Sequence, residues 1–195
     1  MTGRQRSFEK DAMLRTIMCV FWRNGYAGTS MANLTNATGL TKPSLYLAYG
    51  NKEQIFKASL GHYLEMQSET IGGTLHMTNG TVADRIADFL KASARSATQT
   101  DRPSGCFILA ASSEAHSSTM PTGIRALIDN INNMALNMLI DFFKKSVGVS
   151  AERSRLHAEY VLVLQSGVMQ MALRGLDYAA LENVIELSLE RAVFD

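Results

Sequence analysis

Apolar residues recur every three or four positions along most of this chain, which is the spacing of one buried helix face. In the first predicted helix, from about Ser7 to Asn24, Met13 and Ile17 lie one turn apart, and Gly25 then supplies a stop. No stretch alternates between apolar and polar residues as a half-buried strand does. The pattern therefore predicts an all-α chain of about nine helices.

The same spacing predicts the later helices, each bounded by capping residues or glycines. Small and apolar residues fill the helix that follows Ser150, so a neighbouring helix can approach it closely. The predicted elements are a helix from Lys52 to Ile71, a helix starting at Thr81, a loop from Thr98 to Gly105, a short apolar helix from Cys106 to Ala111, helices at 121–147 and 150–171, and a last helix after Gly175.

Two short helices around a glycine turn are predicted near the N-terminus. Thr29 can cap the first of them, and Gly39 breaks the apolar run where a helix-turn-helix has its turn. Thr41 can cap the second helix, with Pro43 in its first turn, where a missing N–H costs nothing. Polar side chains remain on the outer face of this second helix, which suits contact with phosphates and base edges.

This segment resembles the DNA-binding region of the TetR family of bacterial transcriptional regulators. The resemblance extends through the N-terminal region, whereas the rest of the chain matches only in length and helical pattern. It implies a helix-turn-helix DNA-binding domain over residues 1–52 and a helical effector-binding and dimerisation domain over residues 53–195. The residues that carry it are Gly28-Thr29-Ser30-Met31, Thr38-Gly39-Leu40, Ser44-Leu45-Tyr46, and Asn51-Lys52-Glu53 followed by Ile55-Phe56.

The resemblance also implies which side chains face a DNA duplex. Their hydroxyl and ammonium groups can donate to phosphates and bases, and Pro43 can pack against a thymine methyl group. Tyr46 could instead pack beneath the next helix, and Lys42 and Lys52 could be ordinary solvated charges. Ala48 stands where other members carry a larger polar residue, so no base contact is assigned to it. The predicted DNA-binding residues are Thr29, Ser30, Thr41, Lys42, Pro43, Ser44, Tyr46, Tyr49 and Lys52.

Charge is distributed unevenly along the chain, although the net charge is only +1. Residues 1–52 contain seven of the 19 Lys and Arg and two of the 18 Asp and Glu, a net +5. The remaining residues then carry twelve basic against sixteen acidic side chains, a net −4. A basic N-terminal region suits a polyanionic partner, although without the helix-turn-helix its basic flank would indicate only a solvated tail.

Cysteine usage and hydropathy predict the compartment. The two cysteines, Cys19 and Cys106, have no framework spacing, which favours a reducing interior over a disulfide-stabilised secreted fold. No segment offers the roughly 18 to 20 uninterrupted apolar residues of a membrane span, and the N-terminus lacks a signal-peptide stretch. We therefore expect a cytoplasmic protein without a membrane partner.

The segment from Tyr160 to Leu173 is apolar on nearly every side. Such a helix either lies at the centre of the body or forms an oligomer interface. The resemblance favours a homodimer through the last two helices. A two-fold dimer would place two recognition helices on the half-sites of a near-palindromic operator in double-stranded DNA.

The resemblance further implies a pocket for a small-molecule effector in the helical body. Eleven methionines would suit an adaptable, largely apolar pocket, although methionines at helical spacing usually fill a core. No charged cluster in the sequence identifies the effector as an anion or a cation. The candidate effector-binding residues are Met66, Phe89, Cys106, Phe107, Met134, Met138, Gln165 and Met169.

The leading hypothesis is a ligand-responsive transcriptional regulator, a repressor released from its operator by a small molecule. One alternative is a DNA-binding organising factor without an effector, and another is a redox sensor acting through Cys106. An enzyme would need Cys106 and His116 as nucleophile and base, but ten residues of continuous helix would separate them by about 15 Å. A break in that helix would bring this alternative back. No catalytic residue, metal-ligand motif or cofactor is expected, and operator, target genes, effector and sign of regulation stay open.

Overall fold

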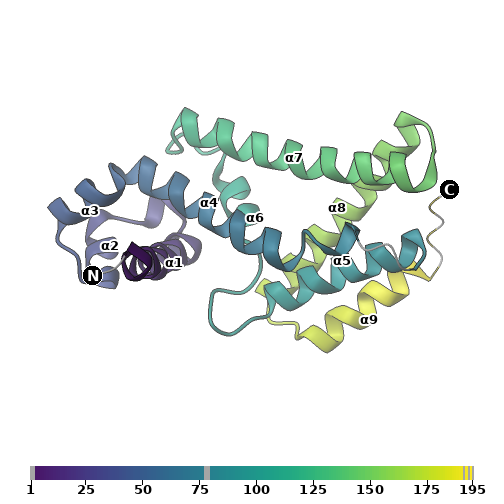
Figure 1. Ribbon diagram of the computed structural model, residues 1–195, viewed down its shortest axis with the longest axis horizontal. Coiled ribbons are helices and arrows are strands. Elements are labelled where there is room, and N and C mark those ends of the chain that lie inside the picture. Colours follow the sequence, from purple (N-terminus) through teal and green to yellow (C-terminus); the bar gives the residue numbers. More distant parts are fainter. Residues whose placement is uncertain (1–2, 77–79, 191, 193, 195) are drawn as a thin grey trace. The chain divides into compact units, whose positions relative to one another are not determined.

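The computed structural model describes residues 3–76, 80–190, 192 and 194, with side chains from Lys10 onwards except that of His76. These residues form nine α-helices and one 3-10 turn, without a strand, so the predicted all-α class is confirmed (Figure 1). The elements are α1 (Gly3–Gly28), α2 (Met31–Thr38), α3 (Lys42–Tyr49), α4 (Lys52–Thr70), η1 (Thr74–His76), α5 (Val82–Ala97), α6 (Phe107–Glu114), α7 (Thr122–Val147), α8 (Ala151–Leu173) and α9 (Tyr178–Leu189).

Side-chain caps form the helix starts that the sequence predicts. At α5, the Thr81 hydroxyl accepts the N–H of Asp84 at 3.1 Å, and the Asp84 carboxylate accepts the N–H of Thr81 at 2.7 Å. At α8, the Ser150 hydroxyl accepts the N–H of Arg153 at 3.2 Å. Each cap satisfies a main-chain donor that the first helical turn leaves without a partner.

Gly25 interrupts α1 at the predicted position. Its backbone angles, φ 70° and ψ 177°, lie in a region that side chains with a Cβ rarely enter, so the regular helix stops there. A short helical segment follows as far as Gly28. The Glu114 carboxylate of α6 lies against Gly25 and accepts the main-chain N–H of Tyr26 at 2.7 Å.

The chain divides into two compact units. Unit 1 contains Met1–Met66 and Phe107–Asp129, and unit 2 contains Gln67–Cys106 and Asn130–Asp195. Helices α4 and α7 therefore contribute residues to both units. The predicted boundary after Lys52 separates a DNA-binding function from an effector-binding and dimerisation function. It stays a prediction, because the two units are defined by packing alone.

Aromatic rings form the core of unit 1. Phe21 meets Phe56 edge to face with centroids 4.9 Å apart, and Trp22 meets Tyr63 in the same way at 5.1 Å. Phe107 from α6 stacks on Trp22 at 5.8 Å and lies within 6 Å of Phe56 and Tyr63. Such pairs add to the stabilisation that burial of the rings provides, and here they hold α1, α4 and α6 together.

Helix α5 is the centre of unit 2, where it packs against α8 and α9. Its inward residues Ile86, Phe89 and Leu90 are at most 3% exposed. On the outer side, Lys91 forms ion pairs with Glu182 at 3.3 Å and Glu186 at 2.7 Å on α9. Burial of the apolar face thus carries most of the packing, because ion pairs at a surface contribute little.

No helix in the described ranges is long and apolar enough to cross a bilayer.

The Gly25 conformation leads to a stability prediction. Gly25→Ala should destabilise unit 1 by about 1–3 kcal/mol, because a Cβ would be strained at this φ and would collide with the Glu114 carboxylate. Urea unfolding followed by tryptophan fluorescence of Trp22 measures the change. Gly28→Ala is the matched control, since a Cβ there meets only the Cβ of Asn24, at 3.8 Å. Equal stability of the two variants would contradict the role given to Gly25.

Candidate nucleic-acid interface

Ser30, not Thr29, caps α2. The Ser30 hydroxyl accepts the N–H of Asn33 at 3.1 Å, and the Asn33 side chain accepts the N–H of Ser30 at 2.8 Å. The predicted cap at Thr29 is wrong because the Thr29 hydroxyl instead donates to the Gly25 carbonyl at 2.7 Å, and the residue is only 1% exposed. Thr29 therefore ties the start of α2 to the break in α1, while Ser30 stays at the surface.

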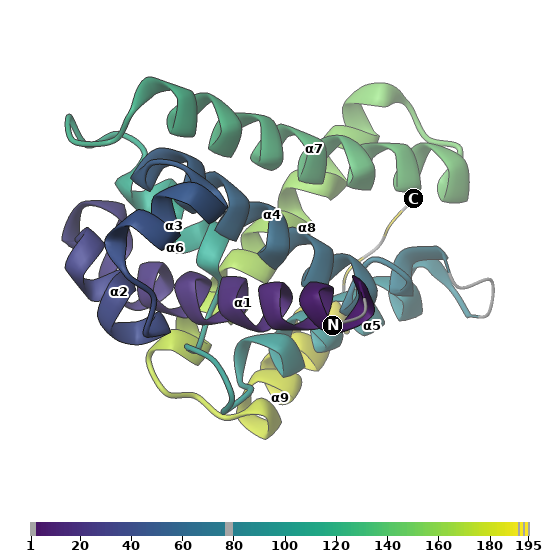
Figure 2. The same ribbon diagram turned by 60° about the vertical axis from the view of Figure 1, so that its left-hand side comes forward.

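The turn and the start of α3 form as predicted. Gly39 adopts the left-handed conformation at φ 69°, and its N–H donates to the Thr35 carbonyl at 2.9 Å. Thr41 caps α3 by accepting the N–H of Ser44 at 3.3 Å. Leu45 is fully buried on the inner face of α3, so the opposite face of α3 is turned outward. In unit 1, α2 packs against both α1 and α3 (Figure 2).

The outward face of α3 carries most of the predicted DNA-binding side chains. Thr41, Lys42, Pro43 and Ser44 are exposed, and Tyr46 is 43% exposed. This exposure excludes the alternative in which Tyr46 packs beneath the next helix. The Lys42 ammonium lies 5.9 Å from the centroid of the Tyr46 ring, so both side chains occupy the same part of the surface. Their contacts with DNA stay predictions.

Tyr49 is placed differently from the residues on the exposed face. Its hydroxyl donates to the main-chain carbonyl of Lys10 on α1 at 3.3 Å, and the Lys10 ammonium lies 5.9 Å from its ring. Burial, and to a lesser extent the Asp11 carboxylate, raises the pKa of the Tyr49 hydroxyl above its ordinary value. Tyr49 thus fixes the end of α3 against α1, whether or not it also touches a phosphate.

Lys52, the other predicted phosphate contact outside α3, is half-buried. Its ammonium lies 4.4 Å from the centroid of the Tyr26 ring, a cation–π geometry. Burial lowers the pKa of Lys52, and the Glu114 carboxylate opposes that shift. The side chain therefore joins the start of α4 to the break in α1, and its role as a phosphate clamp stays a prediction.

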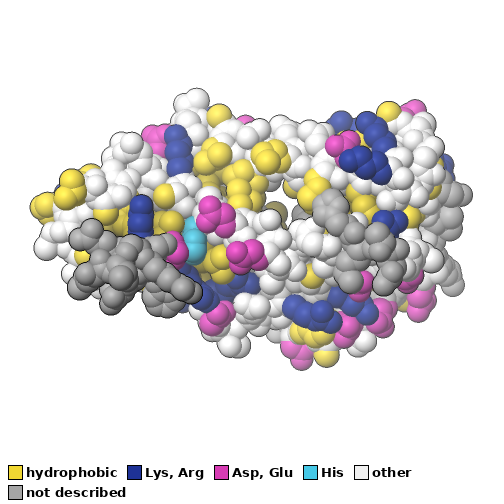
Figure 3. Space-filling model, viewed as in Figure 1, with side chains coloured by type: hydrophobic (Ala, Val, Ile, Leu, Met, Phe, Trp, Pro, Cys, Tyr) yellow, Lys and Arg dark blue, Asp and Glu magenta, His cyan; other side chains and the backbone are white. Residues whose placement is uncertain are grey.

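Sequence reasoning missed Leu47 as a residue of this surface. Leu47 is 91% exposed and lies four positions after Pro43, so the two side chains are neighbours on α3. Figure 3 shows hydrophobic side chains at the surface over α3. The sequence contained the information needed to predict its exposure, because residues two positions apart on a helix point about 200° from each other. Once Leu45 faces the core, Leu47 cannot.

The candidate effector-binding residues differ in their surroundings. In unit 2, Phe89 and Met169 are buried, and the Gln165 amide donates to the Ser93 hydroxyl at 3.0 Å. Met134 and Met138 are exposed on α7, by 63% and 38%, which does not fit an enclosed pocket within one chain. The remaining candidates are Cys106, a half-exposed thiol in unit 2 that forms no disulfide, and Met66 and Phe107 in unit 1, of which Phe107 belongs to the aromatic core.

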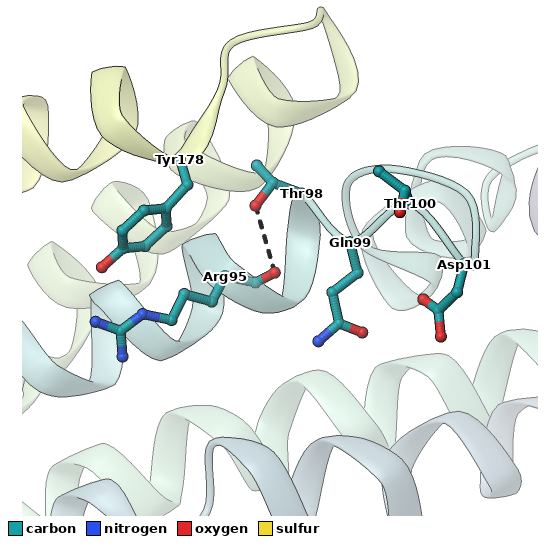
Figure 4. Close-up of a pocket in the computed structure, with 6 residues that line it drawn as sticks. All are labelled: Arg95, Thr98, Gln99, Thr100, Asp101 and Tyr178. Atoms are coloured by element: carbon teal, nitrogen blue, oxygen red, sulfur yellow. Dashed lines mark hydrogen bonds between the residues drawn. The ribbon is translucent and has the colours of Figure 1, made fainter.

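Unit 2 also has an open, polar hollow at its surface (Figure 4). The Arg95 guanidinium lies 5.0 Å from the centroid of the Tyr178 ring, and the Thr98 hydroxyl donates to the Arg95 carbonyl at 3.3 Å. No predicted effector-binding residue is part of its wall. The lining residues are Arg95, Thr98, Gln99, Thr100, Asp101 and Tyr178.

The described side chains contain no group of three His, Cys, Asp or Glu that could hold a metal ion. Cys106 belongs to unit 2 and His116 to unit 1, where His116 is exposed. Helix α6 runs from Phe107 to Glu114, so the continuous helix expected between Cys106 and His116 does not form.

Comparisons with known proteins agree with this geometry. Residues 14–59 match the family described as "Bacterial regulatory proteins, tetR family". The HTH-type transcriptional repressor ComR of Escherichia coli (strain K12) is 37% identical over 107 residues, which are 55% of this chain and 51% of ComR. The chain spans about half the length of the curated relatives it matches.

Solved structures share the fold over nearly the whole chain. A cysteine mutant of the TetR family regulator CifR, bound to 26-base-pair operator DNA, has a TM-score of 0.82 at 24% identity, covering 94% of this chain and 97% of CifR. AibR in complex with isovaleryl coenzyme A and operator DNA has a TM-score of 0.69 at 17% identity, covering 92% of this chain and 97% of AibR. Residues 14–59 are thus similar to the helix-turn-helix region of the TetR family of bacterial regulatory proteins, and the chain shares the all-helical fold of solved TetR-family structures.

Proposed function

We propose that this protein is a transcriptional repressor that binds operator DNA as a dimer and is released by a small molecule. The observation that carries the proposal is the outward face of α3, where hydroxyls, an ammonium and two apolar side chains lie exposed beside a fully buried Leu45. A helix held by one face and polar on the other is the form in which a recognition helix enters the major groove.

The groups at the start of α3 and α2 suit a DNA duplex. Thr41 and Ser44 offer hydroxyls, whose oxygens lie 2.8 Å apart and share a hydrogen bond, and Lys42 offers an exposed cation. Ser30 adds an exposed hydroxyl at the start of α2, where main-chain N–H groups favour an anion. The net +5 of residues 1–52 favours approach to the phosphate backbone.

Dimerisation is supported by an apolar stripe on α8. Leu156, Tyr160 and Val163 are exposed by 62%, 38% and 70%, and their spacing of four and three residues puts them on one side of the helix. On α9, Val184 and Leu187 are also exposed, by 49% and 69%. A second copy of the chain would cover these side chains through an isologous contact and would supply the second recognition helix.

The proposal that an effector releases the protein from DNA is supported by two similar proteins and by the thermodynamic linkage between ligand binding and DNA binding. AibR binds isovaleryl coenzyme A and operator DNA, and ComR is a repressor. A ligand weakens DNA binding only if it binds the DNA-competent conformation less tightly than another conformation.

Selection from a random-sequence duplex library, followed by mapping of bound genomic fragments, tests the proposal. Recovery of a near-palindrome at one or a few promoters would support regulation. Binding at many unrelated sequences would favour an organising factor, and absence of any DNA binding by the folded dimer would overturn the proposal.

Lys42→Ala should weaken binding to the selected operator about tenfold, because a charged donor to a base or phosphate is lost. Electrophoretic mobility shift at fixed salt measures the change. Lys144→Ala, which removes the same charge from the exposed end of α7, should bind like the wild type. If both variants lose affinity equally, Lys42 contributes only bulk charge.

Leu47 should read thymine methyl groups next to Pro43. Replacing one contacted thymine by uracil removes a methyl group and should weaken wild-type binding about fourfold, as expected for one buried carbon. The Leu47→Ala variant should bind both duplexes with nearly equal affinity. Full sensitivity of Leu47→Ala to the uracil substitution would assign the methyl contact to another side chain.

Val163→Glu should disrupt the dimer, because a carboxylate would be buried in the apolar contact. The dimer dissociation constant should rise at least about thirtyfold, as for a central interface residue. Analytical ultracentrifugation measures it, with Asn133→Glu on the exposed face of α7 as the charge-matched control. A Val163→Glu protein that remains dimeric at the wild-type concentration would place the interface elsewhere.

A further inference from the structure

Unit 2 contains a cluster of polar side chains in its interior, which we name the Arg102 cluster. Three members are almost completely buried: Ser93 is 0%, Ser96 3% and Arg102 6% exposed. Ser93 and Ser96 are three residues apart on α5 and therefore share one face of that helix. The cluster consists of Gln67, Ser93, Ser96, Arg102 and Gln165.

Hydrogen bonds connect these side chains. Arg102 Nη2 donates to the main-chain oxygen of Ser96 at 3.1 Å and to its hydroxyl oxygen at 2.9 Å. The Ser96 hydroxyl in turn donates to the side-chain oxygen of Gln67 at 2.7 Å. The Gln165 amide reaches the same face of α5 through Ser93, at 3.0 Å. Polar groups from α4, α5, α8 and the loop after α5 thus converge.

The charge of Arg102 is not balanced within this cluster. Among the Lys, Arg, Asp and Glu side chains that the structure describes, Arg102 is the one that is buried. Its acceptors are neutral oxygens of Ser96, and its Nε–H is buried without an acceptor among the described residues. An arginine stays charged in proteins, and a buried charge without a counter-ion is strongly unfavourable.

Capping of α5 explains only part of this arrangement. Ser96 lies in the last turn of α5, and the helix dipole there amounts to roughly half a negative charge. A cation can interact with that negative helix end while its charged group stays in water. Arg95, in the same turn of α5, is such a cation, because it is exposed and lies over the Tyr178 ring. Burial of Arg102 with an unused donor therefore points to a missing partner.

Apolar residues flank the cluster on the helices that carry it. Phe89 lies one turn before Ser93 on α5, and Met169 one turn after Gln165 on α8; both are buried. The loop that carries Arg102 approaches α8 closely, since a Cβ on Gly105 would lie 3.2 Å from the Met169 carbonyl oxygen. A few polar groups in an apolar lining are the composition of a small-molecule site.

We propose that the Arg102 cluster recognises an anionic oxygen group, a carboxylate or a phosphate, at one end of an effector whose remainder is apolar. The guanidinium would donate to the anion through Nε–H, and the amides of Gln67 and Gln165 would be close enough in the network to adjust to it. This inference rests on the proposed function, because it gives the chemistry of the effector that the repressor would sense.

Titration calorimetry and thermal unfolding of the full-length chain at constant ionic strength test the proposal. The probes are sodium hexanoate, inorganic phosphate, isovaleryl coenzyme A and, as an uncharged counterpart, hexanamide. We expect at least one anion to bind and raise the melting temperature, and hexanamide to have no effect. Hexanoate without phosphate binding would identify a carboxylate site, and phosphate without hexanoate binding a phosphate site.

Two substitutions and one control locate the anion. Arg102→Met should lower the affinity for the anion at least about tenfold, which is the effect of losing a charged hydrogen bond. Arg102→Lys keeps the charge without the planar fork and should give an intermediate affinity. Arg95→Met should bind like the wild type, because Arg95 belongs to the open hollow.

The melting temperature of the ligand-free protein distinguishes an Arg102 that binds an anion from an Arg102 that only caps α5. Removal of an unbalanced buried charge should leave the melting temperature of ligand-free Arg102→Met at or above that of the wild type. The proposal is overturned if the wild type binds none of the three anions, if neither Arg102 variant binds anion more weakly, or if ligand-free Arg102→Met melts well below the wild type. Operator binding by Arg102→Met should persist, so loss of anion binding alone would leave the repressor function standing.

Discussion

The contacts made at the break in α1, at Gly25 and Tyr26, are those on which the proposed DNA-binding surface depends. The Gly25 carbonyl accepts the Thr29 hydroxyl, the Tyr26 N–H donates to Glu114, and the Tyr26 ring contacts Phe56 and the Lys52 ammonium. Four helices of unit 1 therefore meet at two residues. Because Gly25 has the positive φ that ends the regular helix, the chain turns there, and the start of α2 is fixed by the same carbonyl. The exposed face of α3 follows from this arrangement, since α3 packs onto the scaffold so formed.

Burial on one side and exposure on the other give α3 its proposed use. Leu45 is fully buried, whereas Leu47 is 91% exposed, although both are leucines within one short helix. Burying Leu45 stabilises the fold, and leaving Leu47 in water contributes nothing to it. An exposed apolar side chain beside hydroxyls and an ammonium fits the proposed contact with a major groove, where thymine methyl groups are apolar and the base edges and phosphates are polar.

Unit 2 contains apolar contacts between its helices and the buried polar Arg102 cluster, and the two have different roles. Contacts of α5 with α8 and α9 through Ile86, Phe89 and Ile185 provide the stabilising burial. The Arg102 cluster adds hydrogen bonds but leaves a charge unbalanced, which lowers the stability of the free protein relative to an apolar replacement. A protein that senses a ligand is expected to have such a region, because the ligand can shift a conformational equilibrium only where it adds an interaction that one conformation otherwise lacks.

The sequence by itself determined the helices and most of their caps, because helical spacing, Thr41, Thr81 and Ser150 act locally, within one turn of chain. It also contained the motifs by which residues 14–59 resemble the TetR family. Local rules failed at Thr29, where the hydroxyl bonds to the preceding helix and the neighbouring Ser30 becomes the cap. Only tertiary structure could show that Lys52 lies over Tyr26, that Leu47 is exposed, and that Arg102 is buried beside Ser96. These facts depend on which segments distant in sequence pack together, and no pattern of spacing along the chain records the charge or the acceptors that a side chain meets there.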